Sequence, residues 1–152
     1  MSVSLYGSGN TVIQAVNTNS TSASNYFSTS SSSMVSTGLS VTITPQSTTS
    51  KILIMFGGEG GSSSAACGIS LFRNGTNLST GSSGANYIVV TQGGYQGDLS
   101  FVWMDSPATT SAVTYAVYMA TNATSYLGRV NQLTGSNEGA GLSLIALEIS
   151  GS

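Results

Sequence analysis

Chemistry in this chain would have to come from a small set of side chains. The 152-residue sequence contains no histidine, which excludes a Ser-His-Asp triad and a Cys-His pair. Two carboxylates for glycoside cleavage would have to come from Glu59, Asp98, Asp105, Glu138 and Glu148. Glu148 falls in an apolar run, and the other four fall in or beside expected loops, where solvated carboxylates are ordinary. We therefore expect no enzymatic activity.

The sequence gives equally little support to a bound metal, a nucleotide or a reactive thiol. No run of acids has the spacing of a calcium loop, and Gly58-Glu59-Gly60 lacks both a third glycine and the GK[ST] of a phosphate-binding loop. Cys67 is the single cysteine and lies among small or apolar residues, so we expect it to be buried and inert. The expectation is a protein without cofactor or metal.

The charged and apolar residues of the chain argue against two classes of partner, nucleic acids and membranes. The chain has three Lys or Arg against five Asp or Glu, a net charge of −2. Lys51, Arg73 and Arg129 are too few and too scattered to neutralise a row of phosphates, so we expect no nucleic-acid partner. The N-terminus has no signal-peptide pattern, and no apolar run approaches the roughly 18 residues of a membrane span. We therefore expect neither a signal peptide nor contact with a membrane.

Alternating residues predict the fold class. Leu39, Val41 and Ile43 alternate with polar residues up to Pro45, as in a strand with one buried face. Abundant Ser and Thr, 19 glycines and 5% charged residues leave few helix formers. We predict an all-β single domain, a β-sandwich of jelly-roll type with about nine or ten short antiparallel strands over residues 11–152, preceded by an N-terminal arm, residues 1–10.

The expected strands are separated by turn residues. Asn74-Gly75 is a strong hairpin signal, and the segment GGEGGSSS after Phe56 is expected to be a flexible loop. The predicted strands cover residues 11–16, 39–44, 51–56, 67–72, 76–79, 87–91, 99–104, 112–121, 125–130 and 142–149.

Three of these strands, 51–56, 99–104 and 142–149, are apolar on both alternating sets. In an isolated two-layer sandwich one of those sets would be exposed to water at a cost in free energy. We therefore expect a homo-oligomer in which one sheet packs around a symmetry axis. The alternative is that bends and loops of the same subunit cover the second set. The predicted interface residues are Ile52, Ile54, Phe56, Val102, Met104, Ile145 and Leu147.

Three segments carry a resemblance to a known family. They are TGLSVTITPQSTTSKILIMF, WMDSPATTSAVTYAVYM and ALEIS. These segments resemble a module of tailed-bacteriophage virion proteins, which occurs at the ends of fibre proteins and as small free-standing proteins. Such modules are similar to the trimeric jelly rolls of the complement C1q and tumour-necrosis-factor class. The resemblance spans roughly residues 11–150 and implies a homotrimer at the virion surface, made in the host cytoplasm.

Two roles are consistent with that resemblance. A capsid decoration or cement protein would brace the major capsid protein or another virion protein, whereas a fibre head or tip would bind a host surface glycan or protein. A fibre tip normally follows a long shaft, and here Met1 is about ten residues from the first strand, which favours decoration. We expect capsid contacts from the arm, at Val3, Leu5 and Tyr6, unless that arm is simply a frayed terminus.

Overall fold

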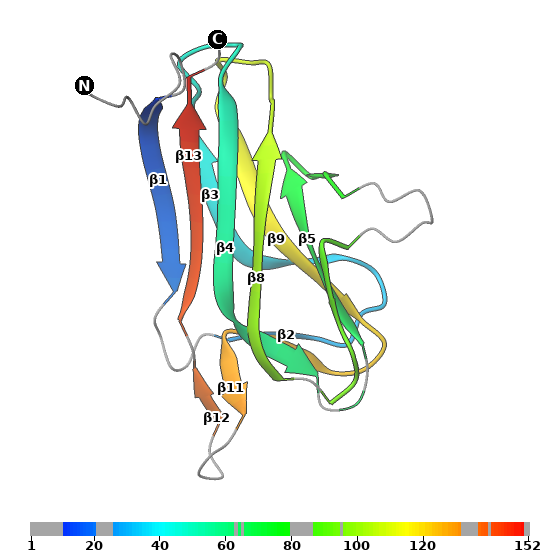
Figure 1. Cartoon of the computed structure of the whole chain (residues 1–152). Helices are drawn as coiled ribbons and strands as arrows, with labels where there is room; N and C mark the ends of the chain where they lie inside the picture. Colours follow the sequence, from blue (N-terminus) through cyan, green and yellow to red (C-terminus); the bar gives the residue numbers. More distant parts are fainter. Residues whose placement is uncertain are drawn as a thin grey trace, which may run out of the picture.

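The protein is a sandwich of two antiparallel sheets (Figure 1). The computed structural model describes residues 11–20, 26–62, 64, 66–79, 87–94, 96–131, 137–139 and 141–150. The prediction of an all-β sandwich is confirmed, while the jelly-roll connectivity stays a prediction. The predicted boundary at residue 10 lies outside the described residues, as do Val3, Leu5 and Tyr6.

The described residues contain thirteen strands. They are β1 (Val12–Ser20), β2 (Phe27–Thr29), β3 (Val35–Ile43), β4 (Lys51–Ser62), β5 (Cys67–Arg73), β6 (Thr76–Asn77), β7 (Val89–Thr91), β8 (Gln96–Asp105), β9 (Val113–Thr121), β10 (Ser125–Leu127), β11 (Arg129–Asn131), β12 (Asn137–Gly139) and β13 (Leu142–Ile149). The excess over the predicted nine or ten comes from short strands. β2 and β12 lie outside the ten predicted strands, and the predicted strand 125–130 is divided at Gly128, whose φ is 78°.

The strands form two layers. Sheet A has the order β1-β13-β4, with β8 on the other side of β4. β10 pairs with the last residues of β4, and β2 pairs with β10. Sheet B has the order β3-β9-β5, with β6 and β7 paired to β5. β11 and β12 form a separate two-stranded ribbon. All of these pairings are antiparallel.

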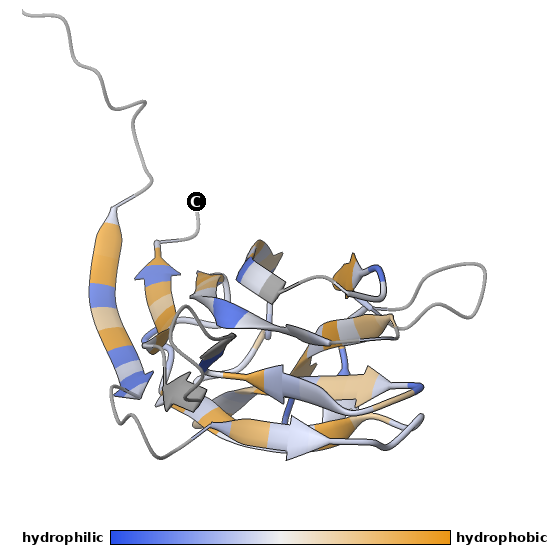
Figure 2. Cartoon of the chain, turned by 90° about the horizontal axis from the view of Figure 1, so that it is seen from below, coloured by the Kyte–Doolittle hydropathy of each residue, from blue (hydrophilic) through white to orange (hydrophobic). Residues whose placement is uncertain are grey.

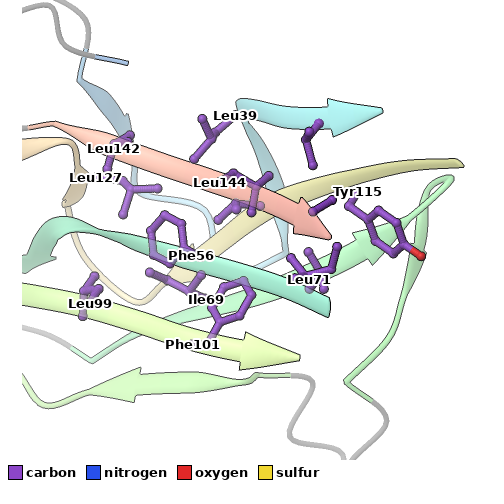
Figure 3. Close-up of a cluster of buried hydrophobic side chains, with 14 of the residues drawn as sticks. Leu39, Phe56, Ile69, Leu71, Leu99, Phe101, Tyr115, Leu127, Leu142 and Leu144 are labelled. Carbon is purple, nitrogen blue, oxygen red and sulfur yellow. The ribbon is translucent and has the colours of Figure 1, made fainter. Parts of the chain in front are cut away.

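The core lies between the two sheets and is built from alternating residues. Buried and more exposed residues alternate along strands such as β13, and Figure 2 shows orange apolar segments on strands of both layers. Figure 3 shows side chains from both sheets meeting, among them Phe56 and Leu144 of sheet A and Ile69 and Leu71 of sheet B. The stacked rings of Phe56 and Phe101, whose centroids are 5.2 Å apart, lie inside this layer.

The prediction was wrong about which side of β4 faces inward. Ile52, Ile54 and Phe56 are 0%, 0% and 3% exposed and belong to the core, so they are not available to another subunit. Because side chains alternate along a strand, the opposite set, Leu53 and Met55, points away from the core. Because both alternating sets of this strand are apolar, the sequence pattern does not show which set faces the core. The neighbouring strands decide it.

The glycine-rich segment after Phe56 is strand, contrary to the expected flexible loop. β4 continues to Ser62 because its backbone pairs with β8 as far as Gly61 and with β10 from Gly60 to Ser62. Glycine suits this stretch because the neighbouring backbone comes close. A Cβ at Gly60 would lie 2.5 Å from the carbonyl oxygen of Tyr126.

The predicted Asn74-Gly75 hairpin is confirmed. Both residues have positive φ, 48° and 83°, as a two-residue turn between β5 and β6 requires. The Asn74 side chain accepts a hydrogen bond from the amide of Thr114, which ties the turn to β9.

Replacing Gly60 by alanine should destabilise the protein by about 1–3 kcal/mol, because the added methyl group overlaps a fixed backbone carbonyl. Gly57→Ala is the matched control, since Gly57 lies in the same strand and a Cβ there meets nothing within 4 Å. The control should keep its stability or gain about 0.5 kcal/mol. Urea unfolding measures both variants, and equal stabilities would contradict the close approach of β10 to β4.

Candidate functional site

Asp105, at the end of β8, is part of an ionic cluster between the two sheets. Its carboxylate accepts hydrogen bonds from Arg73 Nη1 at 2.9 Å and from the hydroxyl of Tyr115 at 2.6 Å. Arg73 and Tyr115 belong to sheet B and Asp105 to sheet A, so the cluster joins the layers. Burial, and next the hydrogen bond to Asp105, raises the pKa of Tyr115. The expectation of a solvated Asp105 in a turn was wrong, because this carboxylate is buried and paired.

Glu148 of β13 is a second buried carboxylate. It accepts hydrogen bonds from the backbone amide of Gln46 at 2.7 Å and from the side chain of Gln14 at 2.5 Å. Burial by itself pushes the pKa of Glu148 upward, but the nearby Ser50 hydroxyl, the Gln14 amide and the backbone amides of Gln46 and Ser47 outweigh it and hold the pKa below its usual value. The Ser50 hydroxyl is buried but makes no hydrogen bond of standard geometry. It lowers the pKa of Glu148 because it lies close to the carboxylate.

These two carboxylates lie in the same part of sheet A. Glu148 and Asp105 lie opposite Ile52 on its two sides, in β13 and β8. Each accepts hydrogen bonds from groups of this chain, and Ile52 stands between them in the buried face of sheet A. The arrangement closes one end of the core with hydrogen-bonded charge.

The outer face of sheet A is an unusual surface. Its side chains stand in rows across four neighbouring strands. One row contains Ala15, Leu147, Leu53 and Met104, and the next contains Asn17, Ile145, Met55 and Val102. Ile149 lies beyond the first row. We call Leu53, Met55, Val102, Met104, Ile145, Leu147 and Ile149 the outer apolar face.

Exposure across this face rises toward β8. The members in β4 and β13 are partly exposed, because neighbouring side chains of the same rows shield one another. Val102 and Met104 in β8 are 66% and 48% exposed. The following row, with Ser143, Gly57 and Ser100, carries no apolar side chain. The apolar part is therefore the end of sheet A at which β8 and β13 terminate (Figure 1).

Part of this surface was predicted from the sequence. Val102, Met104, Ile145 and Leu147 lie on the outer apolar face as one connected group, whereas Ile52, Ile54 and Phe56 lie behind it in the core. Leu53 and Met55 were missed. Register with β13 and β8 identifies them, and the sequence carries no direct signal for that register. Contact between this face and another subunit stays a prediction.

A smaller surface cluster joins two tyrosines and an arginine. The guanidinium of Arg129 lies 4.0 Å from the ring centroid of Tyr126 and 5.3 Å from that of Tyr26. The two rings meet edge to face with centroids 5.8 Å apart, and Tyr26 is 37% exposed. The cluster combines an aromatic surface with a positive charge beside β2 and β10.

The described residues give no support to a reactive thiol, a metal site or a membrane-spanning helix. Cys67 is buried as predicted, with Sγ 3.2 Å from the hydroxyl of Thr91. Within the described part of the chain, no three His, Cys, Asp or Glu residues gather as a metal site. The described residues also include no helix long and apolar enough to cross a membrane.

Comparison with known proteins adds no identity. The chain matches no known protein-family model and none of the curated proteins.

The Glu148→Gln variant should be less stable than the wild type at neutral pH, with a gap that closes in acid. Because the folded-state pKa of Glu148 is below its ordinary value of 4.5, its charge stabilises the fold above that pH, and this contribution disappears as pH falls through the folded pKa. Urea unfolding of both proteins from neutral pH down to pH values well below that pKa measures the gap. A gap independent of pH would show that shape, and not charge, matters at this position.

Proposed function

We propose that this chain is a non-enzymatic structural protein of a phage virion, a homotrimer that decorates the capsid and braces its shell. The observation that carries the proposal is the outer apolar face. A soluble monomer gains nothing from rows of Leu, Ile, Val and Met on the outside of a sheet, whereas a partner subunit that covers them contributes about 25 cal/mol per Å² of buried apolar area.

The scarcity of charge supports the same reading. The chain carries eight charged side chains, three basic and five acidic, and Arg73 and Asp105 engage one another. Long-range electrostatic steering and networks of salt bridges are therefore minor means of attachment. A shell-bracing protein binds many fixed copies of one partner, and apolar contact with backbone hydrogen bonds serves that task.

A second role, a receptor-binding head, has one observation in its favour. The cluster of Tyr26, Tyr126 and Arg129 presents aromatic rings and a guanidinium together, a combination that stacks on and hydrogen-bonds to glycans. In this role the ligand is a host surface glycan, and the outer apolar face still holds the subunits together.

The wild-type protein should be a trimer, with a mass near three times 15.3 kDa by light scattering. Val102→Lys should give a folded monomer, because a charge placed within a covered apolar surface loses its hydration. Ser100→Lys is the matched control, on the same strand and the same face but in the row without apolar side chains, and it should remain trimeric. Circular dichroism should show the same strand content in all three proteins. A wild-type monomer would overturn the trimer, and a trimeric Val102→Lys would move the interface elsewhere.

Purified protein should rebind to virions from which it has been stripped, with an affinity that changes little between low and high salt. Gold labelling of intact virions should place it on the capsid shell. Binding to host cells with no affinity for capsids would replace decoration by the receptor-binding role, and Tyr126→Ala should then weaken cell binding at least tenfold through loss of ring stacking.

A further inference from the structure

Sheet A has two long open edges. Among the described residues, β1 pairs only with β13. Residues 100–104 of β8 pair only with β4. The two edge strands are nine and ten residues long. Monomeric proteins usually protect such edges with lysine, proline, strong bulges or short strands, because an open edge invites another strand.

These edges have little of that protection. Residues 99–104 of β8, LSFVWM, contain no charge and no proline, and Val102 and Met104 are the most exposed apolar side chains of the outer face. β1 has a bulge near Val12 but no lysine or proline along its length. The apolar rows reach the margin of the sheet at β8, and no strand of the described residues continues them there.

The area of the outer apolar face indicates that a second surface takes part in assembly. Four strands about 4.8 Å apart and rows about 7 Å apart outline a patch of about 400 Å² once side chains are included. A stable contact buries about 800 Å² per partner. A second copy bound through this face alone would fall well short, so the adjoining edges are the nearest surface that can supply the rest.

The directions of the two edges are complementary. β1 is antiparallel to β13, β13 to β4 and β4 to β8, so β1 and β8 run in opposite directions (Figure 1). When copies are related by rotation about an axis along the strands, β8 of one copy and β1 of the next meet antiparallel. That is the pairing used throughout this fold.

We infer that β8 of one copy pairs with β1 of the next, which continues sheet A across the subunit boundary. The inference rests on the proposed homo-oligomer and specifies how its subunits join. Rotation without a shift along the strands keeps each row at its own level, so Met104 meets Ala15 of the next copy and Val102 meets Asn17. The outer apolar face then continues from one copy to the next.

Disulfide formation tests this pairing. Within one copy Ala15 and Met104 stand in the same row three strand spacings apart, about 14 Å, beyond the roughly 7 Å between Cα atoms that a disulfide spans. The double variant Ala15→Cys/Met104→Cys can therefore link only separate copies. The native Cys67 is buried and stays in place. Mild oxidation should convert most of the protein into disulfide-linked dimers and trimers. A non-reducing gel should show these products and none larger than a trimer.

Two further variants keep the result interpretable. Ala15→Cys/Ser100→Cys moves the second thiol four residues along β8, about 13 Å, and should give at least fivefold less linked product. Asn17→Cys/Val102→Cys tests the neighbouring row and should behave like the first pair. Light scattering of the same samples before oxidation reports the oligomeric state.

The outcomes separate the two proposals. Trimers without preferential linking of either in-register pair would overturn the edge pairing and leave the trimeric virion protein standing. A protein that is monomeric before oxidation would overturn both. Linked products that extend far beyond three would support the pairing and show that it forms a filament and not a closed ring.

Discussion

The alternation of side chains along β4 is the constraint on which the rest of the structure depends. This strand carries large apolar side chains on both faces, and it pairs with β13 on one side and β8 on the other over most of its twelve residues. One face must enter the core, and the other must then stand outside. Placing Ile52, Ile54 and Phe56 inside fixes Leu53 and Met55 outside, and the register carries the same division into β8 and β13.

Two buried carboxylates connect that division to neighbouring elements. Asp105 and Glu148 flank Ile52, and each is held by hydrogen bonds from other elements, Arg73 and Tyr115 in one case and Gln14 and Gln46 in the other. Removing one partner from such a set leaves a buried charge uncompensated, so the set resists distortion. Both lie at the end of sheet A that bears the apolar rows. The outer apolar face therefore lies on the part of sheet A that these hydrogen bonds connect to other elements.

Features that depend on a few neighbouring residues could be predicted from the sequence. Alternation placed the strand at Leu39 to Ile43, and two residues with positive φ made the Asn74-Gly75 hairpin. Prediction failed where partners distant in sequence decide. The strand through Gly60 exists because β8 and β10 pair with it, and Asp105 is buried because Arg73 and Tyr115 reach it from the other sheet. The outer face follows from register, which short-range patterns do not encode.

Exposure on sheet A follows the number of neighbouring strands. In the middle of the sheet Leu53 and Met55 have strands on both sides, and their row neighbours shield them in part. Among the described residues, Val102 and Met104 have such a neighbour on one side only, and they are the more exposed. Covering the margin thus gives more free energy per residue than covering the centre. A strand that pairs there would also satisfy open backbone groups, and those hydrogen bonds would set the direction and register of the pairing in a chain with few charges.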